Sequence, residues 1–402
     1  MNIKGIKPAA AMVAGGLLLG TTPAHAGGKL VIDDTKWISI GAGLRTGFSA
    51  IEDQAPNGKD WSKEFAVDSA RIYVAGQIHK YVKFTFNTEC IFCNDEALRD
   101  FHVLDAIGQF EFMPEFNVWF GRMLVPSDRA EMAGPFYANT YDFNKTPFYS
   151  SDYSVKFGKG GAGVYGRDNG ATVWGKLFDQ RLVYAAGVFS GLNSATGTGP
   201  NQNDDLLYAA SLRYNFLGIE PAPAYYLGNT YYGAAGDILT LGFAVQYQAN
   251  GAGTFAHPGD FTGYNIDMLF EKVLGDQSVL TFEGEYKNFS ADYSVLAFGD
   301  LDPNAFLMFD GDAYTMTGLY LFPQVIGIGK FQPYVRYTGV DPSHSAFRQE
   351  IEGGVNYIID GTNARISVFY EHGDIATKGL NYAPTASGEK VDAIKVGLQL
   401  QI

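Results

Sequence analysis

The sequence predicts an all-β chain that crosses a membrane as a closed antiparallel barrel of about 16 strands, and three patterns support this fold. The last stretch, 391–402, places apolar residues at alternate positions, opposite Lys, Gly and Gln. Similar alternating stretches recur along the chain, and the connections between them are by turns short and long. A strand with one apolar and one polar face suits a wall between hydrocarbon and water.

The N-terminus has the pattern of a cleaved export signal. Two lysines precede an apolar stretch at 9–20, and residues 24–26, Ala-His-Ala, match the small-x-small pattern before a cleavage site. A membrane anchor is the weaker interpretation, because a spanning helix needs roughly 20 apolar residues. We therefore expect residues 1–26 to be a signal peptide and 27–402 to form the barrel, in the outer membrane of a Gram-negative bacterium.

Composition agrees with a large exported β chain. Among 402 residues there are 49 Gly, 30 Phe and 25 Tyr but only 2 Cys, so the chain is not a disulfide-rich scaffold. Removal of the signal would remove two lysines and no acid, and would take the formal net charge from −14 to −16. Such a charge argues against nucleic acid as a partner.

Period-2 alternation predicts the individual strands. They are expected near residues 36–50, 64–78, 80–88, 102–112, 115–124, 164–178, 181–190, 205–216, 237–249, 262–273, 277–289, 313–323, 330–339, 348–360, 362–372 and 390–402. Polar residues at every second position of an otherwise apolar strand need water on that side. A lumen supplies it, and the even count places both termini on the periplasmic side.

The connections are expected to alternate between short periplasmic turns and long external loops. Short turns are predicted at 79–80, 113–114, 179–180, 275–276 and 360–361, and longer polar stretches near 51–63, 89–101, 125–163, 191–204, 250–261, 290–312, 340–347 and 373–389. Residues 217–236 break this rule, because a long segment with two prolines and four tyrosines falls where a short turn is expected. This segment is either a packed periplasmic excursion or a sign that the strand count is wrong by two.

Three stretches resemble a known family. Residues 112–126 read F-M-P-E-F-N-V-W-F-G-R-M-L-V-P, 166–170 read G-R-D-N-G and 184–191 read Y-A-A-G-V-F-S-G. This pattern resembles the porin O and P family, the group named for phosphate-selective porins. The resemblance implies a 16-stranded outer-membrane barrel, usually a trimer, that passes small solutes. It does not extend to phosphate specificity, because the long connection has only two basic residues before position 150 among several acids.

The longest connection falls where 16-stranded porins fold their third external loop into the barrel. Six aromatic residues between 136 and 149 are more than a solvated loop needs, and they would anchor the segment to the inner wall. Its charges would then form a pore constriction, where surroundings of low dielectric constant strengthen their field. The expected constriction residues are Asp128, Arg129, Glu131, Asp142 and Lys145. The alternative is a loop that packs above the barrel.

The polar faces of the strands predict the charges that line the lumen. The basic residues are Arg45, Arg71, Lys83, Arg213, Lys287, Arg336, Arg365 and Lys395, and the acidic ones are Asp105, Glu111, Asp267, Glu271, Glu283, Glu285, Glu350, Glu352 and Glu371. Because the last strand closes on the first, most bases gather on one wall, with four acids (267, 271, 283 and 285) across from it. Separated charges would set up a transverse field that favours dipolar solutes, and the loop acids would face the basic wall. The alternative is local pairing along the wall.

Two cysteines, Cys90 and Cys93, fall in the second external loop. In an exported protein they most simply form a disulfide. A metal or redox site is the alternative, since His102, Asp95 and Glu96 are near in sequence. That alternative would make the barrel a partner of an electron-transfer or metal-uptake system.

The function expected from the sequence is a water-filled channel for passive diffusion of small hydrophilic solutes or ions. No histidine of the chain belongs to a recognisable Ser motif, so catalysis is not expected. The expected partners are membrane lipid, lipopolysaccharide, the solutes and two further copies of the chain in a homotrimer, without a cofactor or a bound metal.

Overall fold

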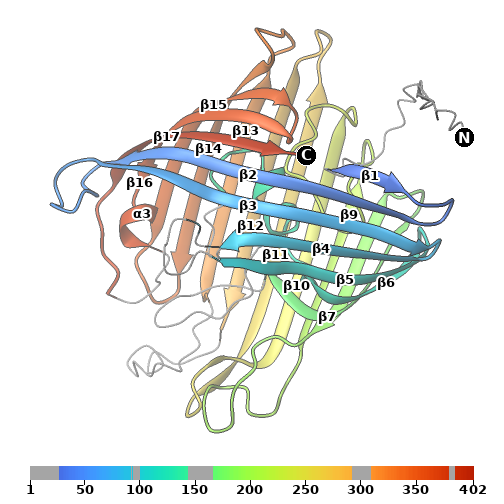
Figure 1. Cartoon of the computed structure of the whole chain (residues 1–402). Coiled ribbons are helices and arrows are strands. Elements are labelled where there is room, and N and C mark those ends of the chain that lie inside the picture. Colours follow the sequence, from blue (N-terminus) through green and yellow to red (C-terminus); the bar gives the residue numbers. More distant parts are fainter. Residues whose placement is uncertain (1–26, 92, 94–99, 144–165, 292–308, 380–384) are drawn as a thin grey trace, which may run out of the picture.

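The barrel is a single closed antiparallel sheet (Figure 1). The computed structural model describes residues 27–91, 93, 100–143, 166–291, 309–379 and 385–402. Its strands are β1 (Gly28–Val31), β2 (Trp37–Ile51), β3 (Ser62–His79), β4 (Val82–Ile91), β5 (Asp100–Met113), β6 (Phe116–Leu124), β7 (Arg167–Leu177), β8 (Leu182–Phe189), β9 (Leu207–Asn215), β10 (Ile238–Gly253), β11 (Pro258–Val273), β12 (Val279–Ser290), β13 (Gly311–Leu321), β14 (Lys330–Pro342), β15 (Arg348–Asp360), β16 (Ala364–Gly373) and β17 (Val391–Gln401). Strands β2 to β17 pair in chain order, and β17 pairs with β2. The predicted 16-stranded barrel is therefore confirmed.

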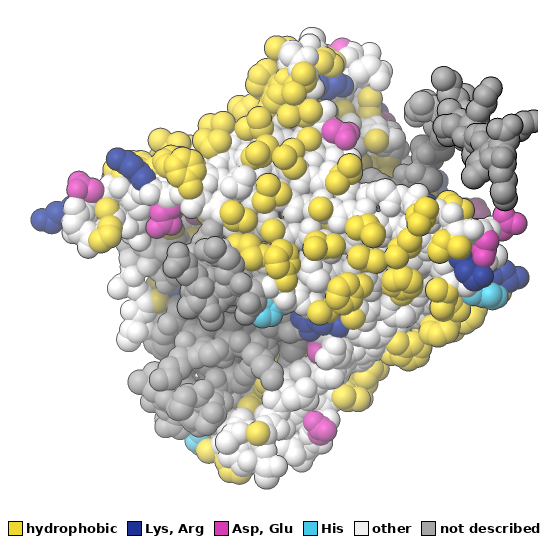
Figure 2. Space-filling model, in the orientation of Figure 1, with side chains coloured by type: hydrophobic (Ala, Val, Ile, Leu, Met, Phe, Trp, Pro, Cys, Tyr) yellow, Lys and Arg dark blue, Asp and Glu magenta, His cyan; other side chains and the backbone are white. Residues whose placement is uncertain are grey.

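Alternation of side chains explains why these segments form barrel strands. In β12, residues at odd positions from Val279 to Phe289 are buried inside, whereas Leu280, Phe282 and Tyr286 are exposed on the outer face. In β17, Ile394 is 48% exposed on the outer face. Hydrophobic side chains accordingly spread over the outer surface in Figure 2, with charged side chains mainly at the strand ends. This distribution suits a wall whose outer face meets lipid.

The barrel closes at the C-terminus as predicted. Strand β17 runs antiparallel to β2, and Ile402 exchanges two backbone hydrogen bonds with Ala42, at 2.9 and 3.0 Å. The structure adds β1, which the sequence did not predict. This strand pairs with β2 from Trp37 to Ile40, beyond the point where the C-terminus ends. Its four residues are too short to show a period-2 pattern.

Two connections differ from the expected lengths. Residues 254–257 form a short link, because β10 and β11 extend as a hairpin through most of the polar stretch expected at 250–261. Backbone pairing needs no apolar side chain, so strands continue into polar sequence. Residues 216–237 do connect neighbouring strands, since β9 and β10 pair directly, so the strand count is correct. The segment is the packed excursion and lies inside the barrel.

Short helices complete the described chain: α1 (Arg129–Ala133), the 3₁₀ helix η1 (Pro135–Tyr137) and α3 (Ile375–Lys378). No helix among the described residues is long and apolar enough to cross a membrane.

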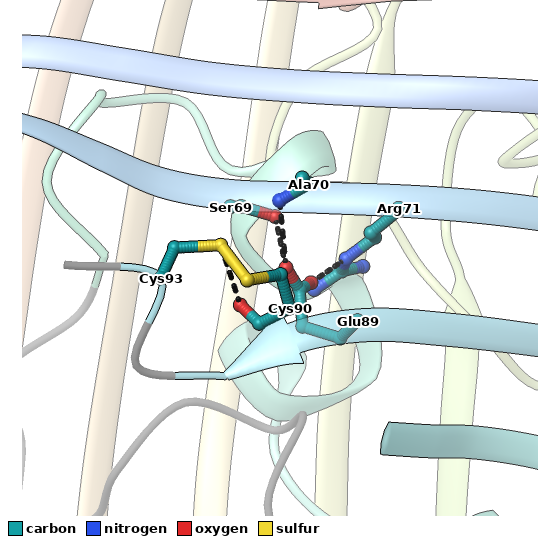
Figure 3. Close-up of a disulfide and its surroundings, with 6 residues drawn as sticks. All are labelled: Ser69, Ala70, Arg71, Glu89, Cys90 and Cys93. Atoms are coloured by element: carbon teal, nitrogen blue, oxygen red, sulfur yellow. Dashed lines mark hydrogen bonds and ion pairs between the residues drawn. A yellow bond between two sulfur atoms is a disulfide. The ribbon is translucent and has the colours of Figure 1, made fainter. Parts of the chain in front are cut away.

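A disulfide joins Cys90 at the end of β4 to Cys93 (Figure 3). Beside it, Glu89 turns toward β3, where it accepts hydrogen bonds from the Ser69 hydroxyl at 2.6 Å and the Ala70 N–H at 3.1 Å and pairs with Arg71. The bonded sulfurs offer no thiolate to a metal. Asp95 and Glu96 of the alternative metal site lie outside the described residues.

Candidate functional site: the barrel interior

The long connection after β6 runs inside the barrel, as the sequence predicts. Between Val125 and Asp142 it forms α1 and η1, and the side chains of Val125, Met132 and Phe136 are at most 1% exposed. Lys145, expected in the constriction, lies outside the described residues. We call the described part of this connection, 125–143, the first insert.

The start of the first insert binds the wall formed by β11 and β12. Asp128 caps α1 by accepting the Glu131 backbone N–H at 3.0 Å, and its carboxylate lies 3.0 Å from the Lys287 ammonium. The Glu285 carboxylate accepts the Ala130 N–H at 2.6 Å. A helix start presents backbone donors, so an acidic wall satisfies them. Because Asp128 caps α1, its side chain lies on the side of the helix that faces β11 and β12.

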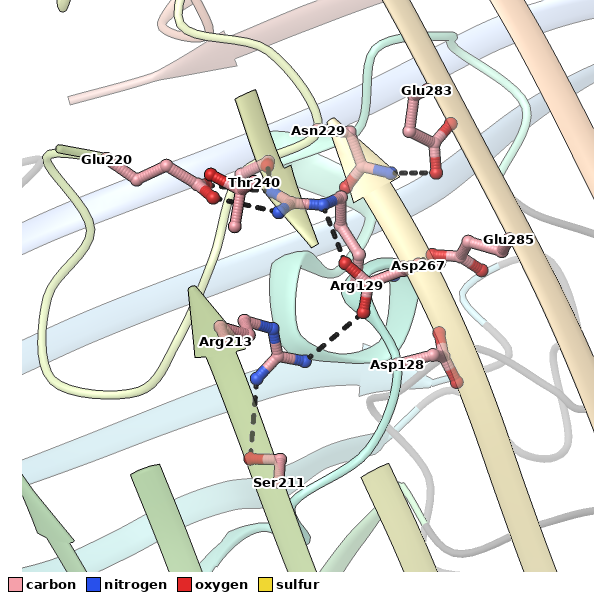
Figure 4. Close-up of polar contacts among 12 residues, drawn as sticks. Asp128, Arg129, Ser211, Arg213, Glu220, Asn229, Thr240, Asp267, Glu283 and Glu285 are labelled. Atoms are coloured by element: carbon pink, nitrogen blue, oxygen red, sulfur yellow. Dashed lines mark hydrogen bonds and ion pairs between the residues drawn. The ribbon is translucent and has the colours of Figure 1, made fainter. Parts of the chain in front are cut away.

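Arg129 is the centre of a buried polar cluster (Figure 4). Its guanidinium binds both carboxylate oxygens of Glu220 at 2.8 Å and one oxygen of Asp267 at 3.1 Å. It also donates to the Gly228 carbonyl at 2.8 Å. A bidentate Arg–carboxylate pair holds two groups in one fixed geometry. Arg129 therefore ties the first insert both to the wall and to the segment 216–237.

Residues 216–237 form a second insert that meets the first inside the barrel. The Leu227 N–H donates to the Met132 carbonyl at 3.2 Å, and the Asn229 N–H donates to the Tyr137 carbonyl at 3.0 Å. Tyr225 is buried, and its hydroxyl donates to a carbonyl at the end of β6. The two inserts support each other, although they leave the wall at opposite ends of the strands. The sequence signal for this role is the unexpected length of the segment and its four tyrosines.

The acidic wall also binds the second insert. Glu271 accepts the Thr230 hydroxyl at 2.6 Å and the Tyr231 N–H at 3.0 Å. Glu283 accepts amide hydrogens from Asn139 and Asn229, one from each insert, at 3.2 Å. The four acids predicted for this wall thus act as acceptors for insert donors.

The opposite wall, which is basic, binds the carbonyl groups of the first insert. Arg365 on β16 donates to the carbonyls of Ala138 and Thr140 at 2.7 and 2.8 Å. Arg336 on β14 donates to the Asp142 carbonyl and to the Thr140 hydroxyl, both at 2.8 Å. Further wall donors to insert carbonyls are Arg45 to Tyr141, Asn356 to Asn139 and Gln399 to Phe136. These contacts satisfy an irregular backbone that has no sheet partner.

Two aromatic rings of the first insert complete this contact. The Arg45 guanidinium lies 4.4 Å from the centre of the Tyr141 ring, and the Arg71 guanidinium lies 4.8 Å from the Phe136 ring. Glycine on the inner face makes room for the rings. A Cβ atom on Gly397 would come within 2.4 Å of Tyr141 ring carbons. The predicted anchoring role of the aromatics agrees with these contacts.

The expectation that the loop acids face the basic wall is right for Asp142 and wrong for Asp128. Asp142 pairs with Lys395 on β17 at 2.5 Å. Asp128 pairs with Lys287 on the acidic wall. Glu131 is fully buried, and its charge attracts the same lysine. The cause is the short α1 helix, whose orientation no alternation pattern predicts.

Many wall charges also pair locally. Lys395 contacts Glu371 at 2.8 Å, and Arg336 contacts Glu352 on the neighbouring strand. Arg213 lies 3.7 Å from Asp267 and donates to the Ser127 carbonyl (Figure 4 shows Arg213 and Asp267). Separation across the barrel and local pairing therefore coexist.

Within the part of the chain that the structure describes, the inserts leave one part of the inner wall uncovered. On β3 and β4 the inward side chains of Gln77, Lys83, Thr85 and Asn87 are only partly buried. On β12, in contrast, every inward side chain from position 279 to 289 is buried. The register pairs Gln77 with Lys83, and Thr85 and Asn87 follow Lys83 on the same face of β4, so these residues form one continuous strip, which we call the open face.

The barrel has the fold of outer-membrane porins. The anion-selective porin of Comamonas acidovorans matches with a TM-score of 0.58 at 14% identity, covering 91% of this chain and 100% of that chain. OmpT of Vibrio cholerae gives 0.53 at 14% identity, with 92% and 99% covered, and Salmonella typhi OmpF gives 0.53 at 11%, with 92% and 99% covered. No protein-family model and no curated protein sequence matches the chain.

Proposed function

We propose that the protein is an outer-membrane porin, a water-filled channel for passive diffusion of small hydrophilic solutes or ions. The open face carries this proposal. Its polar side chains point into the barrel and keep part of their surface accessible, whereas the outer faces of the same strands are apolar, as at Phe86 and Ile72. A polar inner surface beside an apolar belt is the arrangement of a pore wall.

Location and assembly belong to the same proposal. The export signal at 1–26 and the apolar belt support insertion in the outer membrane, with lipid and lipopolysaccharide around the barrel. The resemblance of residues 112–126 to the porin O and P family supports a homotrimer. Light scattering of detergent-solubilised protein tests the trimer, and mass spectrometry of the mature N-terminus tests cleavage before Gly27.

Planar-bilayer recording tests the channel. Folded protein should add stepwise conductance to the bilayer. Asn87→Trp should lower the size of the conductance step, because Asn87 lies on the open face. Phe86→Trp is the matched control, because Phe86 is the next residue in the chain and its side chain faces outward. Faster gel migration of unheated protein verifies folding. A folded wild type that gives no conductance steps contradicts the proposed channel.

A further inference from the structure

We infer that the channel admits uncharged, hydrogen-bonding solutes and discriminates little by charge. This inference rests on the proposed channel and adds the class of solute. It starts from the fact that most charged residues of the described interior contact the inserts or one another, so they are not presented to a passing solute.

The basic wall is occupied by the first insert. Arg45, Arg336 and Arg365 are at most 5% exposed, and each donates to at least one backbone carbonyl between positions 138 and 142. A guanidinium covered in this way offers no donor to a solute anion. We therefore assign these arginines a positioning role: they hold the insert.

The acidic wall lies behind the inserts. Asp267, Glu271, Glu283 and Glu285 are at most 4% exposed, and each accepts a hydrogen bond from an insert group. A solute cation on the open face would be separated from these acids by the inserts. Two of these acids are also paired with cations, Asp267 with Arg129 and Glu285 with Lys287, and this pairing reduces the net charge that the acidic wall presents to the open face.

Most side chains of the open face itself are neutral. Gln77, Thr85 and Asn87 carry hydroxyl and amide groups, which both donate and accept hydrogen bonds, and each already donates one within the wall, to the Thr35 carbonyl, Gln109 and Asp105 respectively. Lys83, the charged residue of the open face, is paired with Glu111 at 2.5 Å, and at the margins of this face Arg167 is paired with Asp105 at 2.8 Å and Arg71 with Glu89. A lining of neutral donors and acceptors matches solutes with several hydroxyl or amide groups, such as small sugars.

Electrical and flux measurements on wild type test the class of solute. In a KCl gradient at low salt, the permeability ratio of K⁺ to Cl⁻ should lie within about threefold of one, since a fully exposed unpaired charge would shift it by about fivefold. In liposome swelling, a neutral monosaccharide should enter as fast as its acid or amine derivative, or faster. A ratio beyond about tenfold, or faster entry of one charged derivative, overturns the inference.

Chemical modification of folded protein tests the location of the path. Thr85→Cys on the open face should react with cationic and anionic methanethiosulfonate reagents, and the two products should shift the permeability ratio in opposite directions, by about fivefold each. Thr317→Cys is the matched control, because Thr317 also faces inward but is 1% exposed under the inserts. The native cysteines are joined in a disulfide.

The outcomes separate the two proposals. Conductance with near-unit ion selectivity, together with modification at position 85 and not at 317, supports the inference. Conductance that is strongly ion-selective, or unaffected by modification at position 85, overturns the inference and leaves the channel intact. Absence of conductance from folded protein overturns both. The cysteine variants are modified after folding, so a folding defect does not mimic these results.

Discussion

Gly397→Ala should loosen the first insert from the wall. The added Cβ would lie 2.4 to 2.5 Å from three carbon atoms of the Tyr141 ring, whereas carbon atoms in contact lie about 3.5 to 4.0 Å apart. The ring must therefore move by roughly 1 Å. The three clashing atoms, Cγ, Cδ1 and Cδ2, are next to the backbone end of the side chain, so rotation of the ring cannot remove the clash. The backbone of the insert has to shift with it.

The cost follows from what the Tyr141 ring contacts. Its hydroxyl donates to Asp68 at 2.5 Å, and its face covers the Arg45 guanidinium, so a shift weakens both contacts. Overpacking a filled interior costs about 1 to 3 kcal/mol. This range would raise the undocked fraction of the insert by about 5- to 150-fold.

Single-channel recording measures this change. Gly397→Ala should show larger or more variable conductance steps than wild type, while Gly353→Ala should match wild type because a Cβ there meets no atom within 4 Å. In a Tyr141→Ala background, which lacks the ring, Gly397→Ala should have no further effect. Steps of wild-type size and variance in folded Gly397→Ala, or an equal effect in the Tyr141→Ala background, would refute the reasoning.

Three further predictions follow from the closure, the disulfide and the buried acid. Deletion of residues 398–402 removes pairing along β2 and should abolish heat-modifiable barrel in the outer membrane, because lipid cannot satisfy an open edge; normal assembly would contradict the closure. Cys90→Ser/Cys93→Ser should keep the wild-type conductance and bind no stoichiometric metal by elemental analysis, and a metal lost in the variant would favour the metal site instead. Burial opposes ionisation of Glu220, but the interaction with Arg129 outweighs burial and lowers the pKa of the Glu220 carboxyl below 4.5. The contribution of ionised Glu220 to docking of the inserts is therefore present above about pH 4.5, and it is lost as the pH falls through the lowered pKa of the folded protein. Conductance variance should rise over that acid range in wild type, and Glu220→Gln should already show the raised variance at pH 7; equal variance in both proteins at pH 7 would contradict it.

The sequence by itself determined the barrel. Period-2 alternation places each residue on the inner or outer face, because side chains of a strand alternate strictly, and a closed sheet repeats this rule in every strand. Ile394 and the charged residue beside it, Lys395, are placed correctly on opposite faces from this pattern alone. The six aromatics of the long connection also indicated correctly that it enters the barrel.

Only the tertiary structure decided how the interior charges are used. Alternation predicts that Arg365 and Glu285 point inward, but it does not predict which insert atom each one meets. Insert backbone is irregular, so its carbonyl and N–H directions depend on α1, η1 and the turn at 216–237, none of which has a sequence period. The two inserts come together through Arg129 and Glu220, which are 91 residues apart in sequence. A contact between two irregular segments arises from packing in three dimensions, and that packing leaves the open face on β3 and β4.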